Sequence, residues 1–361
     1  MIKQKKIDVQ SPQLVFVSMT NSMGGAENIL QMLARSESSP VIFLKQTFSS
    51  ILPDCSDRAT YLTQGSLLVG FVRLLKEIRK YRKNYILFST HPYLNAYLGF
   101  LKRIGYIESA VIVRECSSVF TRYSGLKRLS YKIAYRLGYP SVNIVICQTD
   151  LMRSQLLHFN SFISCRKVIV RENPLDLENV RSRAAVHLKD QDADNNYICS
   201  AGRLIAIKGF DILIKSFSKI TLQNKDLKLL ILGDGIEKEN LIRLIKDMDL
   251  EGRVILRGHV DNPIPFFKNA RLCVVSSIQE GFPNVLLEMM AVNSSVVSTL
   301  CAGGIENISS IIKAEANNVD ALSCAIQRAL TPDHKSQPEI SSDYLKKRTP
   351  GDFLKSVLNQ V

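Results

Sequence analysis

No apolar run in this chain of 361 residues approaches the roughly 18 residues that a membrane-spanning helix requires. The apolar run at 14–17, which follows a basic stretch at 3–6, is too short for the core of a signal peptide. Low-complexity tracts are also missing, while apolar residues make up 46% of the chain. The sequence therefore predicts a folded protein, long enough for two domains with full cores.

The cysteines lack any spacing that is typical of a zinc site or a redox pair. The eight cysteines are scattered along the chain, at Cys55, Cys116, Cys147, Cys165, Cys199, Cys273, Cys301 and Cys324. Several lie in apolar, strand-like runs, as reduced core cysteines do. This usage indicates a reducing cytosol.

Acidic residues are scarce in the first half. Residues 1–175 carry 24 Lys and Arg against 10 Asp and Glu, whereas residues 176–361 carry 23 of each, so the whole net charge of +14 lies in the first half. Two stretches, 73–83 and 122–136, mix basic residues with Leu, Ile and Tyr at near-helical spacing. The pattern is typical of helices on an anionic membrane surface, although plain solvated helix faces would also produce it. No recognition motif supports a nucleic-acid partner, and we expect none.

Strand-like runs and helical patterns alternate through both halves, which predicts parallel α/β sheets. The character changes at 173–195, where Asn-Pro precedes a charged stretch that we expect to be a crossover and linker. We therefore predict two Rossmann-like domains, 1–175 and 176–338, facing each other across a ligand-binding cleft. The tail, 339–361, contains two short helical patterns.

The stretch 280–291 follows an apolar run at 272–275 that predicts a buried strand. Gly281 permits a tight turn and Pro283 suits the first turn of a helix, so we expect a strand, a glycine loop and a helix. The helix N-terminus would suit a phosphate, and the carboxylates of Glu280 and Glu288 would accept hydrogen bonds from sugar hydroxyls. The pattern favours a nucleotide sugar, although an ordinary turn with two solvated glutamates has the same spacing.

Arg203 and Lys208 lie in a loop after the predicted strand that ends at Gly202. Two cations in such a loop can hold a diphosphate and neutralise the charge that builds on a departing nucleoside diphosphate, although Arg and Lys are also common on surfaces. Gly233 follows the next buried strand in a Gly-Asp-Gly turn. Its missing side chain would let a nucleotide base approach the backbone.

Five motifs occur in the order seen in one family. They are Gly24-Gly25-Ala26-Glu27, Asn173-Pro174-Leu175-Asp176, Gly202-Arg203 with Lys208-Gly209, Gly233-Asp234-Gly235, and Glu280-Gly281-Phe282-Pro283 with Glu288. From about residue 14 to 330 the chain resembles the GT-B glycosyltransferases of family 4. The resemblance implies two Rossmann-like domains and sugar transfer from a nucleotide donor with retention of configuration. It implies no cofactor and no metal, and the absence of an Asp-x-Asp motif at a strand end agrees with this.

The resemblance places the donor in the C-terminal half, where Arg203 and Lys208 would hold the diphosphate, Glu280 the transferred sugar and Glu288 the ribose. The other donor-binding positions that it implies are Gly24, Gly25, Gly202, Gly233, Gly281, Phe282, Asn284 and Val285. No side chain is an evident general base, and in the family an oxygen of the donor phosphate is thought to take the acceptor proton.

Arg114 and Glu115 stand where the family often has a histidine that touches the donor sugar. They would contact donor or acceptor hydroxyls, or form a plain ion pair. His91 follows the predicted strand at 86–89 and faces the cleft by position, but a histidine that caps a helix would occupy the same place.

We therefore expect a retaining hexosyltransferase that acts in bacterial surface polysaccharide assembly, such as lipopolysaccharide, O-antigen or capsule synthesis. Its partners would be a nucleotide sugar, a glycan acceptor that is lipid-linked, and an anionic membrane, on the inner face of the plasma membrane. The alternatives are a soluble acceptor, a catalytically inactive sugar-nucleotide-binding protein, and a nucleic-acid-binding protein. The intact set of Arg203, Lys208, Glu280 and Glu288 argues against an inactive protein.

Overall fold

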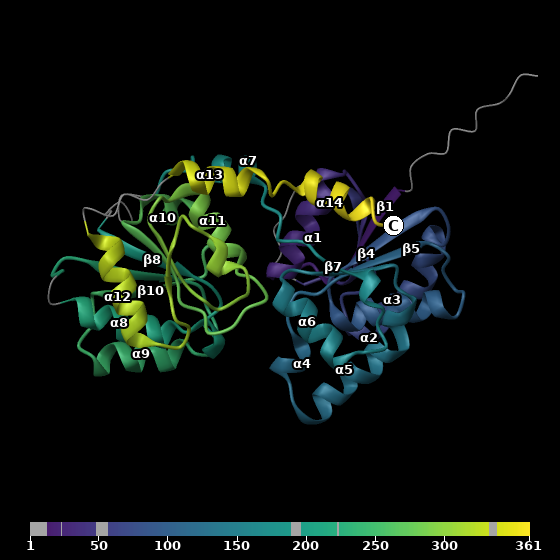
Figure 1. Ribbon diagram of the computed structural model, residues 1–361, viewed down its shortest axis with the longest axis horizontal. Coiled ribbons are helices and arrows are strands. Elements are labelled where there is room, and N and C mark those ends of the chain that lie inside the picture. The colour runs from purple at the N-terminus through teal and green to yellow at the C-terminus, as the bar shows by residue number, and fades with distance from the viewer. Residues whose placement is uncertain (1–12, 23, 48–56, 189–195, 222–223, 332–337) are drawn as a thin grey trace, which may run out of the picture. The chain divides into compact units, whose positions relative to one another are not determined.

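The computed structural model describes residues 13–22, 24–47, 57–188, 196–221, 224–331 and 338–361. The chain divides into two compact units, each built on its own parallel sheet (Figure 1). The first comprises Met1–Gln148, Arg153–Arg171 and Leu354–Val361, and the second Thr149–Met152 and Glu172–Phe353. Within the predicted linker, residues 189–195 lie outside the described part of the chain.

The first unit contains a seven-stranded sheet with the order β3-β2-β1-β4-β5-β6-β7. Its strands are β1 (Gln13–Thr20), β2 (Val41–Lys45), β3 (Ala59–Tyr61), β4 (Tyr85–Ser89), β5 (Ala110–Arg114), β6 (Ile144–Cys147) and β7 (Val168–Val170). All neighbouring strands pair in parallel. The central strands are almost continuously buried because helices cover both faces of such a sheet. The strand order reverses between β1 and β4, where sheets of this kind bind ligands.

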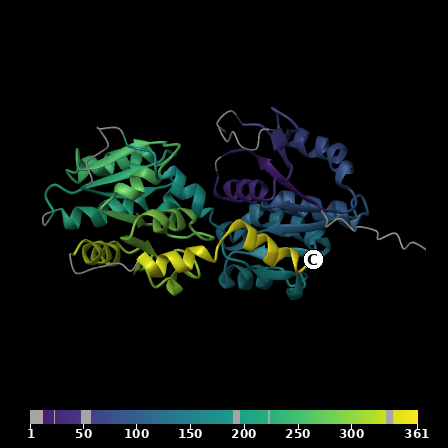
Figure 2. The same cartoon turned by 90° about the horizontal axis from the view of Figure 1, so that it is seen from above.

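Helices cover the two faces of this sheet. They are α1 (Gly25–Ser36), α2 (Leu67–Glu77), α3 (Pro92–Arg103), α4 (Val119–Arg122), α5 (Gly125–Gly138), α6 (Asp150–Phe159) and α14 (Pro350–Leu358), with 3-10 turns η2 (Ile78–Tyr81), η3 (Tyr139–Ser141) and η4 (Cys165–Lys167). Right-handed crossovers put α3 and α5 on one face, while α1 and α14 cover the other (Figure 1). Figure 2 shows α14, the yellow helix beside the C-terminus mark, against this unit, where Arg171 Nε donates to Ser356 Oγ at 3.0 Å.

The second unit contains a six-stranded parallel sheet with the order β10-β9-β8-β11-β12-β13. Its strands are β8 (Tyr197–Ala201), β9 (Lys228–Leu232), β10 (Val254–Gly258), β11 (Leu272–Val275), β12 (Val296–Thr299) and β13 (Ile312–Ala314). Its helices are α7 (Leu177–Arg183), α8 (Phe210–Ile220), α9 (Lys238–Asp247), α10 (Ile264–Asn269), α11 (Asn284–Val292), α12 (Val319–Leu330) and α13 (Pro338–Lys346), with 3-10 turns η6 (Ala206–Lys208) and η7 (Ile305–Asn307). The order reverses between β8 and β11, so the loops after these two strands meet at one edge.

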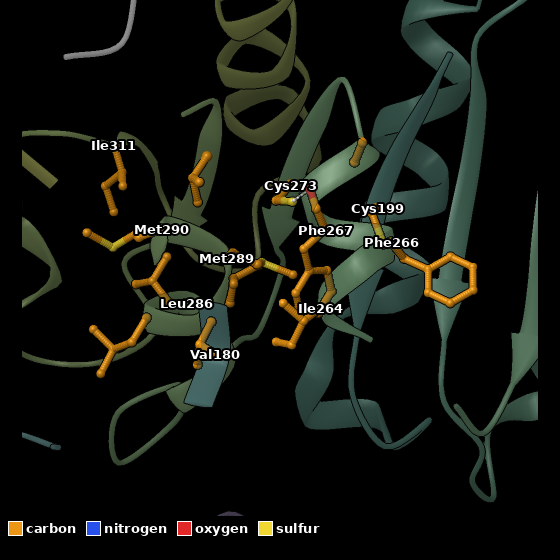
Figure 3. Close-up of a cluster of buried hydrophobic side chains, with 14 of the residues drawn as sticks. Val180, Cys199, Ile264, Phe266, Phe267, Cys273, Leu286, Met289, Met290 and Ile311 are labelled. Carbon is orange, nitrogen blue, oxygen red and sulfur yellow. Dashed lines mark hydrogen bonds between the residues drawn. The ribbon is translucent and has the colours of Figure 1, made fainter. Parts of the chain in front are cut away.

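Two apolar clusters cover the faces of this sheet. In one, Leu286 and Met289 of α11 pack with Ile264 and Phe267 of α10 and with Val180 of α7 (Figure 3). The other joins α8, α9 and α12 to the opposite face. Because α11 is buried along this side, its N-terminus and the position of Glu288 are fixed by the core.

Candidate functional site

Two loops of the second unit meet at the carboxyl edge of its sheet. The loop after β8 and the loop after β11 are joined by Ile278 N donating to Ile207 O at 2.8 Å and by Ser276 Oγ donating to Lys208 O at 2.9 Å. Gly209 permits this approach, since it has a φ of 61° and a Cβ there would lie 2.3 Å from Ser276 O. The strand order, which makes β8 and β11 neighbours, thus brings Lys208 beside residues 276–280.

Lys208 and Glu280 form an ion pair between these loops. Lys208 Nζ lies 2.5 Å from Glu280 Oε1, and each side chain is 18% exposed. The same carboxylate oxygen accepts a hydrogen bond from Ser277 Oγ at 2.8 Å, and Glu280 N donates to Cys301 O at 2.8 Å. A charge-assisted bond in a partly desolvated place is strong and orients both groups. The pair leaves two ammonium protons of Lys208 and the Oε2 atom of Glu280 for a ligand.

Arg203 lies in the same loop as Lys208 but is exposed. Among the residues that the structure describes, its guanidinium forms no hydrogen bond and no ion pair. The backbone around it is held, because Leu204 N donates to Asp234 O at 2.9 Å and Glu237 N donates to Leu204 O at 2.9 Å. Arg203 is therefore a free cation on a fixed loop.

Gly202 and Gly233 bring the ends of β8 and β9 together. A Cβ on Gly233 would lie 1.9 Å from Gly202 O, and Gly202 N donates to Leu232 O at 2.9 Å. Contact with a nucleotide base at Gly233 stays a prediction. The structure adds an internal reason for glycine there, which is the close approach of two backbones.

Helix α11 begins directly after the glycine loop. Phe282 is buried, whereas Gly281, Asn284 and Val285 are partly exposed. Asn284 Oδ1 accepts a hydrogen bond from Asn173 Nδ2 at 2.5 Å, which ties the start of the helix to the crossover segment. The first amides of a helix have no intrahelical acceptor and carry partial positive charge, so this end suits an anion.

Glu288 lies one turn further along α11. Burial raises the pKa of its carboxyl above the usual range, and the positive charge of Arg183 on α7 opposes that rise. No described residue donates a hydrogen bond to it. A desolvated carboxylate with unused acceptor capacity is suited to bind hydroxyl groups.

In the first unit, His91 directly precedes α3 at the carboxyl end of β4. Its Nδ1 is buried and has no hydrogen-bond partner among the described residues, and its ring stacks on Tyr93 with centroids 6.1 Å apart. Burial lowers the pKa of its imidazole. The side chain does not cap the helix, so its contact with an acceptor or a donor sugar stays a prediction.

Arg114 and Glu115 are both buried, at 1% and 2% exposure. The Glu115 carboxylate accepts hydrogen bonds from Tyr135 Oη at 2.6 Å and from Tyr139 Oη, and Asn95 Nδ2 lies 3.4 Å away. Burial raises the pKa of this carboxyl, and the bonds from the two tyrosines partly oppose the rise. The hydrogen-bond partners of Glu115 are thus buried side chains of its own unit, and the residues next to it in the sequence did not indicate them. The spacing of four residues between Tyr135, in α5, and Tyr139, at the start of η3, was the available signal.

Gly24 and Gly25 form the turn between β1 and α1. Gly24 precedes the first turn of α1, where Asn28 N donates to Gly24 O at 2.9 Å. A Cβ on Gly24 would lie 2.2 Å from Glu27 Oε2, because the Glu27 side chain folds back over the loop. The approach of this loop to a donor stays a prediction.

The residues that the structure describes contain neither a membrane-spanning helix nor a cluster of metal ligands. No helix in this part of the chain is long and apolar enough to cross a membrane. No group of three or more His, Cys, Asp and Glu side chains is placed to hold a metal ion among the same residues.

Comparison with known proteins shows which proteins this chain is similar to. The family model described as "Glycosyl transferases group 1" matches residues 195–332. The Campylobacter jejuni N-acetylgalactosamine-N,N'-diacetylbacillosaminyl-diphospho-undecaprenol 4-alpha-N-acetylgalactosaminyltransferase is 28% identical over 76% of this chain and 77% of its own length. The lipopolysaccharide core biosynthesis glycosyltransferase LpsE of Rhizobium meliloti is 37% identical, over 32% of each chain.

The fold agrees with these matches. The structure of Anabaena HepE in complex with UDP-glucose superposes with a TM-score of 0.77 at 17% identity, covering 96% of this chain and 98% of HepE. The predicted fold class, two parallel α/β sheets in a GT-B arrangement of the chain, is confirmed. The chain is therefore a glycosyltransferase with the GT-B fold, homologous to bacterial group 1 (family 4) glycosyltransferases.

Proposed function

We propose that this enzyme transfers a sugar from a uridine diphosphate sugar to a lipid-linked glycan during synthesis of a bacterial surface polysaccharide. The observation that carries the donor half of this proposal is the 2.5 Å pair of Lys208 and Glu280 at the ends of neighbouring strands. The uridine nucleotide is supported by HepE, which binds UDP and UDP-glucose.

The pair allows two ligand groups to be held side by side. Lys208 has two ammonium protons left for a diphosphate oxygen, and Glu280 has Oε2 left for a sugar hydroxyl. Arg203, exposed and unengaged among the described residues, supplies the second positive charge on the diphosphate. The leaving diphosphate is thus stabilised where negative charge develops, and one of its oxygens takes the proton of the acceptor hydroxyl.

The neighbouring groups complete the donor site. The first amides of α11, after Gly281 and Phe282, face anionic groups with their partial positive charge. The Glu288 carboxylate accepts hydrogen bonds from the ribose hydroxyls.

The lipid-linked acceptor is supported by the relative from C. jejuni, whose acceptor is named as a diphospho-undecaprenol, and by LpsE, named for lipopolysaccharide core biosynthesis. It is also supported by the basic first half of the chain. A lipid-linked acceptor on the cytoplasmic side would place the enzyme at the inner face of the plasma membrane as a peripheral protein.

The direct test is incubation with a panel of nucleotide sugars, scored by mass spectrometry for release of the nucleoside diphosphate. We expect hydrolysis with at least one uridine diphosphate sugar and its loss in Lys208→Ala. Lys215→Ala is the matched control, because Lys215 also pairs with a carboxylate, Asp211 at 3.2 Å, but on the solvated surface of α8. Binding of a nucleotide sugar without turnover of any donor would instead favour the inactive sugar-nucleotide-binding protein.

A further inference from the structure

Helix α5 presents an apolar stripe to solvent. Its four members, which we call the α5 stripe, are Leu126, Leu129, Ile133 and Leu137, with exposures of 86%, 51%, 54% and 46%. Their spacing of three and four residues places them on one face of the helix. Single exposed apolar residues are ordinary on a protein surface, but a continuous line of them marks an interaction surface.

The opposite face of α5 is anchored, so the helix cannot roll to bury the stripe. Tyr131 stacks on Tyr93 of α3 with ring centroids 4.5 Å apart, and Tyr135 donates to the buried carboxylate of Glu115. At the end of the helix the backbones touch, since a Cβ on Gly138 would lie 2.0 Å from Ala96 O. The outward direction of the stripe is therefore part of the folded state.

Cations flank the stripe. The segment 122–138 carries five basic residues and no acidic one: Arg122, Lys127, Arg128, Lys132 and Arg136. None of the five forms an ion pair with a residue that the structure describes. Four of them lie over aromatic rings, which leaves their charge uncompensated. For example, Lys127 Nζ lies 4.0 Å from the centroid of the Tyr123 ring, and Arg128 Cζ lies 4.5 Å from that of Phe159.

The other basic stretch, 73–83, differs because some of its cations form ion pairs with carboxylates. Lys80 lies 2.8 Å from Glu77, and Lys83 and Arg82 lie 3.1 and 3.4 Å from Glu108. Arg73 donates to Leu62 O at 2.6 Å. Two carboxylates thus offset part of the positive charge of this stretch within the fold, which the sequence alone did not reveal.

We propose that α5 docks the enzyme on a bilayer that contains anionic lipids, with the α5 stripe inserted at the boundary between headgroups and acyl chains. The flanking cations then lie at the level of the headgroup phosphates. Charge complementarity selects this occupant, because five uncompensated cations with no carboxylate match a negative surface. The inference deepens the proposed function, since it rests on a lipid-linked acceptor. Of the two basic stretches that the sequence offered, it assigns the membrane contact to the one that contains α5.

The chain contains no tryptophan, so a single introduced one reports on one position. We would compare Leu126→Trp and Ile133→Trp with Ile242→Trp, which lies on the mixed-charge helix α9 and is 45% exposed. The probes are vesicles of phosphatidylcholine with phosphatidylglycerol at three to one, with lipids brominated along the acyl chains as quenchers. We expect a blue shift and quenching for the two α5 variants, none for the α9 variant, and reversal by salt. Quenching absent from both α5 variants would overturn the proposal.

Loss variants test the two components separately by vesicle sedimentation of the full chain. Leu126→Gln with Ile133→Gln should lower the partition coefficient at least about tenfold, because two inserted side chains are lost. Lys132→Gln with Arg136→Gln should lower it about fivefold for each charge removed. The matched control, Arg82→Gln with Lys83→Gln, removes two cations that share the carboxylate of Glu108 and lie outside α5, and should change it less than about twofold. If the partition coefficient falls in the control variant and is unchanged in the α5 variants, the assignment to α5 is wrong.

Light scattering and donor hydrolysis distinguish membrane docking from dimer formation and from a failure of the proposed function. If light scattering shows that Leu126→Gln with Ile133→Gln breaks a dimer and leaves partitioning unchanged, the stripe is an interface between copies and the proposal fails. Donor hydrolysis without vesicles should be the same in this variant and in the wild type, since α5 lies outside the donor site. Docking through α5 without donor hydrolysis would refute the proposed function alone, and hydrolysis without docking would refute the membrane surface alone.

Discussion

Lys208 Nζ donates to Glu280 Oε1 at 2.5 Å across 72 residues of sequence, at the edge of the sheet where β8 and β11 lie side by side. Both residues were candidates from sequence, one for the diphosphate and one for the sugar. In these roles, their contact would place the diphosphate and the transferred sugar of the donor next to each other.

Arg203→Ala and Lys208→Ala should each lower turnover about a hundredfold, because loss of one charged contact to a developing anion typically costs about 3 kcal/mol. The two variants should differ in stability. Lys208→Ala leaves the half-buried Glu280 without its cation and should cost about 1 kcal/mol of unfolding free energy, whereas Arg203, which is exposed, should cost almost nothing. Steady-state kinetics and urea unfolding give the two readouts. Wild-type turnover in either variant would contradict the diphosphate role.

Glu288→Ala should weaken binding of the bare nucleoside diphosphate roughly tenfold or more, since hydrogen bonds to a charged group contribute about 1.5–3 kcal/mol. Glu280→Ala should spare that binding and impair transfer, because its proposed partner is the sugar. Calorimetry with uridine diphosphate separates the roles, with the exposed Glu239→Ala on α9 as a control for loss of a carboxylate. Equal loss of nucleotide affinity in both variants would refute this division.

Activity should persist in excess chelator. Arg203 and Lys208 supply two positive charges at the place where the leaving diphosphate develops its own, so a bound cation is not needed for neutralisation. The measurement is nucleoside diphosphate release with and without a chelator. Complete loss that manganese restores would reveal a metal requirement.

Glu115 should make stability fall as pH rises. Its pKa is raised in the folded state, so between the unfolded value, about 4.3, and the folded value the native protein binds more protons than the unfolded chain. Stability from this group is complete below the unfolded pKa and is lost as pH rises through the folded one. Glu115→Gln removes the titration and should flatten the dependence of unfolding free energy on pH above about 4.5.

The matched control for this prediction is Glu108→Gln, an exposed carboxylate that pairs with Lys83. Urea unfolding from pH 5 to 8 supplies the slopes, which matter more than the absolute stability because glutamine also alters the hydrogen bonds to Tyr135 and Tyr139. An identical slope in Glu115→Gln and in the wild type would show that Glu115 does not titrate in this range.

The sequence by itself determined the fold class and the positions of most elements. Apolar runs such as 14–17 and 272–275 are long enough to specify buried strands, and the motif order was sufficient to identify the family. Two strands were missed, β3 and β13. Each has three residues that do not form an apolar run, unlike the equally short β7, Val168–Val170. The tail was predicted as two helices, but only packing assigned α13 to the second unit and α14 to the first.

The tertiary structure decided which charges are compensated and which side chains meet. A basic residue looks the same in a sequence whether or not a carboxylate lies opposite it, so only the fold distinguishes Lys83, paired with Glu108, from Lys132. The pairing of Lys208 with Glu280 likewise follows from the strand order, which places two distant loops at one sheet edge. Helical and strand patterns arise from neighbours along the chain, whereas these contacts depend on which strands are adjacent in the sheet.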